Sequence, residues 1–188
     1  MTMQENLNKL HNQLKIRSAR LYWTYVIQYN QAEVYHKTQK RLNVFSLVLS
    51  GLVASTAFLN ILQICGISQE VGNLIIFILG ITSTVLLAFI AKFDYDKRIA
   101  KAVEYGTKIR QVWMKYQSLI TDMLAGRYSS YEQICELRDK LRDEEYTILH
   151  DAPITLQKAY EEASKKIRNG HGDITREEIE AGNEQQNL

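Results

Sequence analysis

The chain has 188 residues, with 23 Lys and Arg against 21 Asp and Glu, one proline and two cysteines. This size fits one domain and argues against a multidomain enzyme. A hydrophobic share of 46% and a charged share of 23% are typical of a soluble protein. The charge is nevertheless distributed unevenly, because Glu70 is the single charged residue between Arg41 and Lys92. The sequence therefore predicts a membrane-inserted segment over residues 42–91.

The first predicted element in chain order is a long helix over residues 5–41. It makes up most of a predicted N-terminal cytoplasmic region, residues 1–41. Apolar side chains recur there at three- and four-residue spacing, and no proline or glycine interrupts the pattern. Because the pattern runs directly into the apolar segment, the membrane helix is expected to extend far into the cytoplasm.

The apolar segment is predicted to form a transmembrane helical hairpin. Residues 42–64 and 71–91 are free of charge, and at about 1.5 Å per residue each can cross a hydrocarbon core of about 30 Å. The connection over residues 65–70 is too short to be a domain. A hairpin buried in a soluble bundle is the alternative, but core helices normally have a polar face that these segments lack.

Basic residues flank the hairpin on one side only. Lys and Arg precede the first span and follow the second, whereas the connecting turn contains neither: Lys37, Lys40, Arg41, Lys92, Lys97, Arg98 and Lys101. The positive-inside rule then places both termini in the cytoplasm. Phe93 and Tyr95 occupy the position of an interfacial aromatic anchor.

A cytoplasmic helical region is predicted over residues 92–168, followed by an acidic flexible tail over residues 169–188. A helix over residues 92–125 continues the second span, Ser129 and Glu132 form a capping box that opens the next helix, and Pro153 begins a last one. The predicted fold is an all-α membrane protein, a two-span hairpin whose helices extend into a cytoplasmic helical bundle.

The sequence lacks the motifs of common catalytic and metal sites. There is no phosphate-binding glycine loop followed by Lys and Ser or Thr, no nucleophile elbow, and no Cys or His cluster at ligand spacing. We therefore expect no enzyme, no catalytic residues, no metal and no cofactor.

Polar side chains within the spans are the candidates for lining a pore, because such groups usually face protein or water. They are Asn43, Ser46, Ser50, Thr56, Asn60, Gln63, Asn73, Ser83 and Thr84. Close helix packing is the alternative explanation for the small residues among them. A pore requires several subunits, since two spans cannot enclose a channel, and the lack of intramembrane Asp or Glu predicts no strong cation selectivity.

Arg17 and Arg110 fall on the apolar stripes of their helices, where a buried guanidinium needs an anion. A Glu or Asp of a neighbouring helix is the favoured partner, and a nucleotide phosphate is the alternative. Nearby aromatic residues can stack a base, although aromatics at this spacing more often belong to a core. The ligand-binding candidates are Arg17, Arg20, Tyr22, Trp23, Arg98, Lys101 and Arg110.

Three segments of the chain resemble the SLATT family of bacterial two-span membrane proteins. They are ARLYWTYVIQYNQAEVYHKTQKRLNVFSLVLSGLVAS before and within the first span, DYDKRIAKAVEYGTKIRQVWMKYQSLITDML after the second, and ILHDAPITLQKAY near the end. The resemblance covers roughly residues 5–168. It implies an inner-membrane effector of antiviral defence that forms an oligomeric pore under the control of a partner nucleotidyltransferase.

The sequence hypothesis is a homo-oligomeric ion channel, expected to be a tetramer, in the bacterial inner membrane. It is expected to sense a nucleotide or oligonucleotide signal, depolarise the membrane and arrest growth. A non-conducting membrane anchor or scaffold that recruits a cytoplasmic partner is the alternative.

Overall fold

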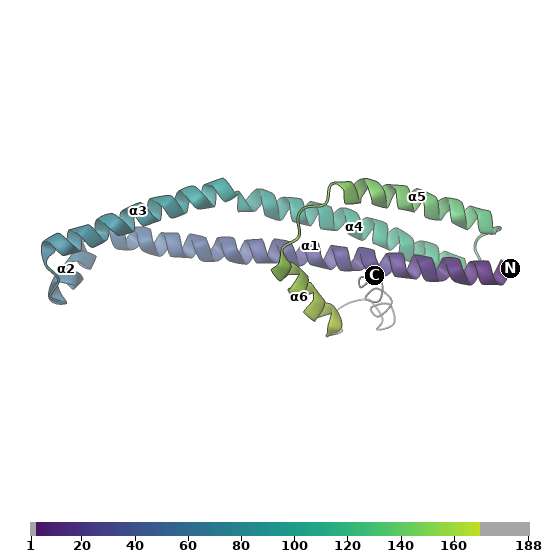
Figure 1. The fold of residues 1–188 in the computed structure, drawn as a ribbon, viewed down its shortest axis with the longest axis horizontal. Helices are drawn as coiled ribbons and strands as arrows, with labels where there is room; N and C mark the ends of the chain where they lie inside the picture. The colour runs from purple at the N-terminus through teal and green to yellow at the C-terminus, as the bar shows by residue number, and fades with distance from the viewer. Residues whose placement is uncertain (1–2, 170–188) are drawn as a thin grey trace. The chain divides into compact units, whose positions relative to one another are not determined.

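The computed structural model describes residues 3–169, except for the side chains of Thr56 and Ala57, and this part of the chain is all helical (Figure 1). The helices are α1 (Met3–Ala54), α2 (Thr56–Ile64), α3 (Gln69–Phe93), α4 (Tyr95–Leu124), α5 (Tyr131–His150) and α6 (Gln157–Arg168). The all-α class is thus confirmed. The predicted acidic tail lies outside the described residues apart from Asn169.

The chain divides into two compact units, which are described separately. Among the described residues, 3–34 and 100–169 belong to the unit that we call the body, and residues 35–99 form the unit that we call the hairpin. The helices α1 and α4 each contribute residues to both units.

The core of the body lies where α1, α4 and α5 pack together, with α5 alongside α4 (Figure 1). Leu14, Ile109 and Tyr116 are at most 1% exposed, and Ile134 of α5 joins them at 4%. Burial of each such side chain contributes about 1.5–3 kcal/mol. The three- and four-residue spacing in the sequence therefore identified the faces that form this core.

The helix α5 begins one residue later than the sequence predicted, because Ser130 and not Ser129 is its N-cap. The Ser130 side chain accepts a hydrogen bond from the backbone N–H of Gln133 at 3.2 Å. The Gln133 side chain accepts in return from the backbone N–H of Ser129 at 3.2 Å and from its hydroxyl at 3.1 Å. Gln133 therefore takes the role expected of Glu132.

The helix α6 begins at Gln157 instead of Pro153, and a buried glutamine explains the delay. The Gln31 side chain, on a residue 1% exposed, donates to the carbonyl of Ile154 at 2.9 Å and accepts from the N–H of Leu156 at 3.0 Å. These two bonds satisfy backbone groups outside a helix and tie the segment to α1. Lys166 of α6 adds a bond to Asn30 of α1 at 2.6 Å.

The first predicted span, residues 42–64, is not a single helix in the hairpin. Ser55 has an extended backbone conformation, with φ −90° and ψ 113°, and it separates α1 from α2, which are bent by 71°. The uncharged end of α1, residues 42–54, is about 20 Å long and by itself is shorter than a hydrocarbon core of about 30 Å. The helix α2 instead packs on α3, where Leu59 approaches Gly72.

Asp94 interrupts the helical continuity that the sequence predicted after the second span. Its backbone is left-handed, with φ 47° and ψ 61°, a conformation that Asp tolerates better than most residues. The Asp94 carboxylate accepts from the N–H of Lys97 at 3.3 Å, and Arg98 donates to the carbonyl of Phe93 at 2.9 Å. These bonds satisfy backbone groups at the junction of α3 and α4.

Candidate functional site

The surface of the hairpin is strongly apolar. Leu47 is 74% exposed, Phe77 65% and Val85 63%. The helices over Gln69–Leu124 include a stretch long and apolar enough to cross a membrane, and only 6% of that apolar window is buried. A core helix of a soluble protein would be mostly buried, so this exposure favours a lipid environment. A second such stretch exists only if α1 and the Phe58–Ile64 part of α2 count as one bent span.

Three pore-lining candidates, Ser46, Ser50 and Ser83, are buried or partly buried within the hairpin. The hydroxyls of Ser50 and Ser83 are hydrogen bonded at 3.0 Å, which joins α1 to α3. Ser46 and Ser83 are buried at 4% and 7% exposure. Small polar residues at a helix contact let the backbones approach and share hydrogen bonds. For these three positions, the geometry agrees with the close-packing explanation.

The other described candidates are exposed on the apolar surface of the hairpin. They are Asn43, Asn60, Gln63, Asn73 and Thr84. The Thr84 hydroxyl donates to the carbonyl of Gly80 at 2.9 Å, so it is satisfied within its own helix. The side chain of Thr56 lies outside the described residues. An amide in lipid is costly unless it meets a polar partner, so the exposed amides mark surfaces that need one.

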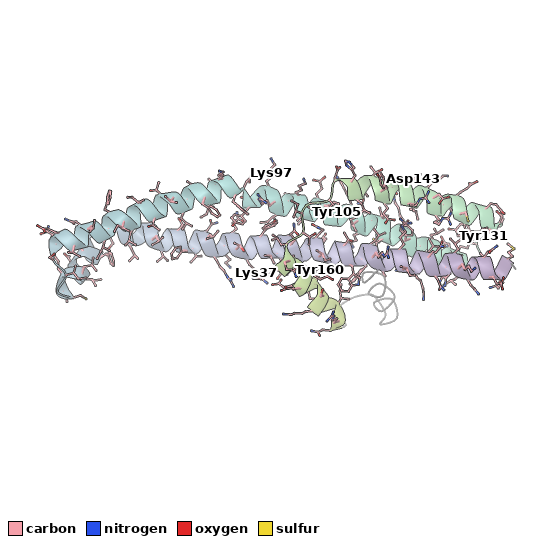
Figure 2. The ribbon with its side chains drawn as sticks, viewed as in Figure 1. Lys37, Lys97, Tyr105, Tyr131, Asp143 and Tyr160 are labelled. Carbon is pink, nitrogen blue, oxygen red and sulfur yellow. The ribbon has the colours of Figure 1, made fainter. Side chains whose placement is uncertain are left out.

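Basic side chains gather near the ends of the hairpin opposite its turn. The side chains of Lys37 and Lys97 extend away from their helices (Figure 2). The exposed basic residues of this unit are Lys37, Lys40, Arg41, Lys92, Lys97 and Arg98. The Arg98 guanidinium lies 4.1 Å from the centre of the Phe93 ring, and Phe93 stacks against Phe89 with centroids 5.6 Å apart. Arg98 and Phe93 therefore form a cationic and aromatic pair at this end.

Arg17, the first ligand-binding candidate, has a carboxylate partner within the body. Its Nε donates to Oε2 of Glu145 at 2.8 Å, and the Tyr116 hydroxyl donates to the same oxygen at 3.0 Å. Glu145 is only 6% exposed. Burial, reinforced by the Glu145 charge, raises the pKa of Tyr116, which keeps this hydroxyl protonated as a donor. The sequence favoured an acidic residue of a neighbouring helix as the partner of Arg17, and Glu145 of α5 is such a residue.

Glu145 was not among the residues predicted from the sequence, although it is the partner of Arg17. A signal was present, because Glu145 lies four residues after Leu141 and three before Ile148, on the face of α5 that packs against the core. An acid at such a position requires a partner from another helix.

Arg17 and Arg20 also border a groove of about 370 Å³, together with Arg138 of α5. Arg138 contacts the carboxylate of Asp139 at 3.0 Å. Arg17 and Arg138 therefore already have carboxylate partners within the chain.

Three other ligand-binding candidates of the body, Arg110, Tyr22 and Trp23, do not lie where their predicted ligand-binding role would place them. Arg110 is exposed, not buried on an apolar stripe, and its guanidinium lies 5.8 Å from the centre of the Tyr25 ring. The stripe prediction is wrong because Arg110 follows Ile109, the residue that faces the core. Tyr22 and Trp23 are buried at 5% and 6% exposure, so both rings belong to the core.

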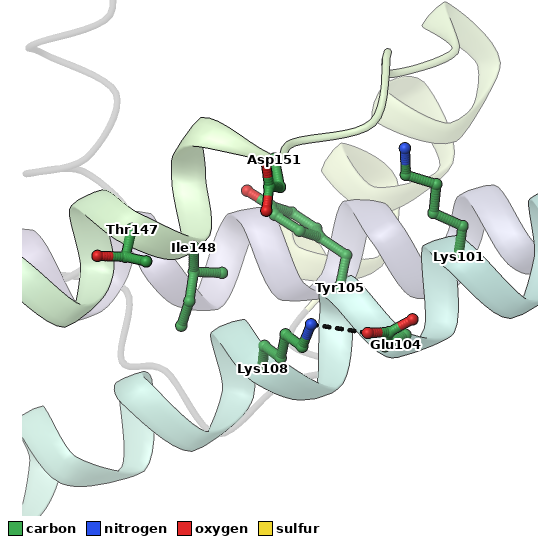
Figure 3. A pocket seen from close by; sticks show the side chains of 7 residues that line it. All are labelled: Lys101, Glu104, Tyr105, Lys108, Thr147, Ile148 and Asp151. Carbon is green, nitrogen blue, oxygen red and sulfur yellow. Dashed lines mark hydrogen bonds and ion pairs between the residues drawn. The ribbon is translucent and has the colours of Figure 1, made fainter.

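Lys101 lines a second groove of the body, of about 400 Å³, between α4 and the end of α5 (Figure 3). The groove residues are Lys101, Glu104, Tyr105, Lys108, Thr147, Ile148 and Asp151. Among the residues that the structure describes, none offers the Tyr105 hydroxyl a hydrogen-bond partner. Of these residues, Lys101 alone was a ligand-binding candidate predicted from the sequence. The four- and three-residue spacing of Lys101, Tyr105 and Lys108 was the available signal.

Within residues 3–169, no three His, Cys, Asp or Glu side chains are grouped so that they can hold a metal ion. The free thiols of Cys65 and Cys135 lie in different units.

The fold and the exposed apolar helices define a helical protein of the membrane-associated class. Residues 10–180 match the family described as "SMODS and SLOG-associating 2TM effector domain family 4", and the chain belongs to this SLATT family. The expected family is thus confirmed. Neither the curated proteins nor the solved structures yielded a match. Family and fold together indicate a membrane effector of defence systems that is associated with SMODS nucleotidyltransferase partners.

Proposed function

We propose that this protein is a homo-oligomeric, pore-forming effector of the bacterial inner membrane that acts in anti-phage defence. A nucleotide-derived ligand from the partner nucleotidyltransferase controls the pore, which depolarises the membrane and arrests growth. The protein is not itself an enzyme. Both spans cross the membrane and both termini lie in the cytoplasm.

The exposed amides on the apolar hairpin are the observation that carries this proposal. Asn43 lies on α1, Asn60 and Gln63 on α2, and Asn73 on α3. Lipid cannot satisfy an amide, and in a monomer these groups would face it. Assembly of several copies around an aqueous path gives them water or the amide of a neighbouring copy. A tetramer is the assembly that we propose.

Two features of the hairpin support the proposed topology. The α1 and α2 pair crosses the membrane as one bent span, since a broken helix is tolerated where protein covers it and α2 packs on α3. The exposed basic residues flanking the hairpin remain on the cytoplasmic side, as the positive-inside rule requires.

A non-conducting scaffold is the second candidate, and the Ser50–Ser83 hydrogen bond favours it. This bond uses small polar residues to hold α1 against α3, which is a structural role that needs no water-filled path. In this function the body recruits a cytoplasmic partner and the hairpin serves only as an anchor.

Membrane potential in cells distinguishes the two functions. The chain is produced with and without its neighbouring nucleotidyltransferase, and a potential-sensitive dye is read while membrane fractionation confirms insertion. We expect a pore to depolarise the cells in one of these two states. Cells that remain polarised in both states, with inserted protein present, would exclude the pore.

Leucine variants connect the potential to the exposed amides. Asn43→Leu and Asn73→Leu remove the proposed polar lining, and we expect insertion to persist while depolarisation falls by at least about tenfold. Phe77→Leu, which changes an apolar residue that is also exposed, is the matched control and is expected to behave as wild type. Full depolarisation by both asparagine variants would refute the assigned lining.

A further inference from the structure

The groove between α4 and the end of α5 contains a polar group that the described chain leaves unsatisfied. Tyr105 is 5% exposed, and its ring extends from α4 toward the end of α5 (Figure 3). Its hydroxyl has no hydrogen-bond partner among the described residues. Buried hydroxyls are nearly always hydrogen bonded, so an unsatisfied one at a groove indicates a ligand that supplies the missing partner.

Burial also raises the pKa of Tyr105, so its hydroxyl stays protonated over the whole physiological range. A protonated phenol donates a hydrogen bond to an oxygen acceptor of a ligand.

Lys101 and Lys108 line the groove beside Tyr105, and they differ in their ion-pair partners within the chain. Lys108 donates to Glu104 at 2.7 Å, which neutralises one wall of the groove. Lys101 makes no ion pair among the residues described, although its charge, after the hydrogen bond from Lys108, also lowers the pKa of Glu104; its ammonium can therefore still bind an anion. Lys101 and Tyr105 are four residues apart and therefore share one face of α4.

The opposite wall carries a negative group. The Asp151 carboxylate follows α5 and lies 3.3 Å from Nδ1 of His150. A carboxylate at this wall accepts N–H groups, and with Glu104 it balances the two lysines of the lining. The groove therefore suits a ligand that combines one anionic group with N–H donors, and it disfavours a polyanion.

We propose that this groove binds the controlling ligand as a mononucleotide with a single phosphoryl group. Lys101 and the Tyr105 hydroxyl hold the phosphate oxygens, and Asp151 accepts an N–H of the base. This assignment rests on the proposed control by a nucleotide-derived ligand. A volume of about 400 Å³ lies within the range of small-molecule sites, toward its lower end.

The arginine groove is the weaker location for the same ligand. Arg17 and Arg138 already contact Glu145 and Asp139, at 2.8 Å and 3.0 Å. A phosphate there would have to compete with these direct ion pairs. Lys101 makes no ion pair among the residues described and has only a charge interaction with Glu104, and the Tyr105 hydroxyl has no hydrogen-bond partner there.

Calorimetric titration of the full chain in detergent tests the site. The probes are the 3′,5′-cyclic mononucleotides of the four RNA bases and inorganic phosphate. We expect wild type to bind at least one cyclic nucleotide, with affinity reduced at least about tenfold in Tyr105→Phe and in Lys101→Ala. Lys115→Ala, on the same helix but paired with Glu144 at 2.6 Å, is the matched control and is expected to change affinity less than about twofold.

A stability measurement separates ligand binding from folding. Because Tyr105→Phe deletes a hydroxyl that the described chain does not satisfy, we expect its ligand-free melting temperature to equal or exceed that of wild type. Unchanged affinity in both variants would overturn the site, as would the absence of binding by every cyclic nucleotide at millimolar concentration. Equal affinity for inorganic phosphate and the cyclic nucleotides would contradict the proposal that Asp151 accepts an N–H of the base.

Dye release from liposomes keeps this proposal distinguishable from the pore. Binding that depends on Tyr105, without release by wild type, would support the site and exclude the pore. Release that responds equally to ligand in wild type and Tyr105→Phe would support the pore and overturn the site.

Discussion

Replacing Arg17 with methionine tests whether this residue serves the fold or a ligand. Among the described residues, the change leaves the Glu145 carboxylate, on a side chain 8% exposed, with the Tyr116 hydroxyl as its one partner. Removing one member of a fully buried pair costs about 3–5 kcal/mol, whereas an exposed pair contributes about 0–1 kcal/mol. Because the Arg17 side chain is 42% exposed, we expect an intermediate loss of about 1–3 kcal/mol.

Thermal unfolding followed by circular dichroism measures this loss, which corresponds to a melting temperature lower by about 2–12 °C. Arg110→Met is the matched control, since its exposed contact with the Tyr25 ring contributes about 0.5–1 kcal/mol at most. In a double-mutant cycle, Arg17→Met with Glu145→Gln is expected to show a coupling of about 1–3 kcal/mol. Unchanged stability in Arg17→Met, with weaker nucleotide response, would refute the structural role.

Three further variants probe the body. Burial lowers the pKa of His11, so the folded state binds fewer protons than the unfolded chain and stability falls as pH drops below about 6.5. When unfolding is measured as a function of pH, His11→Gln should therefore lose less stability at acid pH than wild type. Gly106→Ala is expected to cost about 1–3 kcal/mol in urea unfolding, because the added Cβ would lie 3.1 Å from the Tyr29 ring; an unchanged midpoint would contradict this close approach. Gln31→Leu should lower the free energy of unfolding by about 1–3 kcal/mol and speed proteolysis of residues 152–156, because it removes the two hydrogen bonds to this segment. Equal cleavage rates in the variant and wild type would contradict this role of Gln31.

Most helices and the core of the body followed from the sequence because periodicity is a local property. The spacing of Leu10, Leu14, Ile109 and Tyr116 identified the faces that the structure buries. The helix limits were less predictable. The breaks at Ser55 and Asp94 involve residues that also occur within helices, and the delayed start of α6 depends on Gln31, which is distant in sequence.

The candidate sites were predictable only in part. Arg17 was expected to need an acid, but the choice of Glu145 required the packing of α5 against α1. Polar residues of the spans were all candidates for a pore until α1 and α3 were placed together, and then Ser50 and Ser83 formed a bond with each other. The groove at Tyr105 was missed except for Lys101, because a sequence does not reveal that a buried hydroxyl lacks a partner.

The sequence alone determined the helical class, the apolar segment and the family, since composition, periodicity and similarity are carried by the residues themselves. The tertiary structure decided which polar groups are satisfied. Arg17 and Ser50 have partners within the chain, while Tyr105 is left without one among the described residues. The physical reason is that a hydrogen bond depends on distances of about 3 Å between atoms far apart in sequence, which only packing fixes.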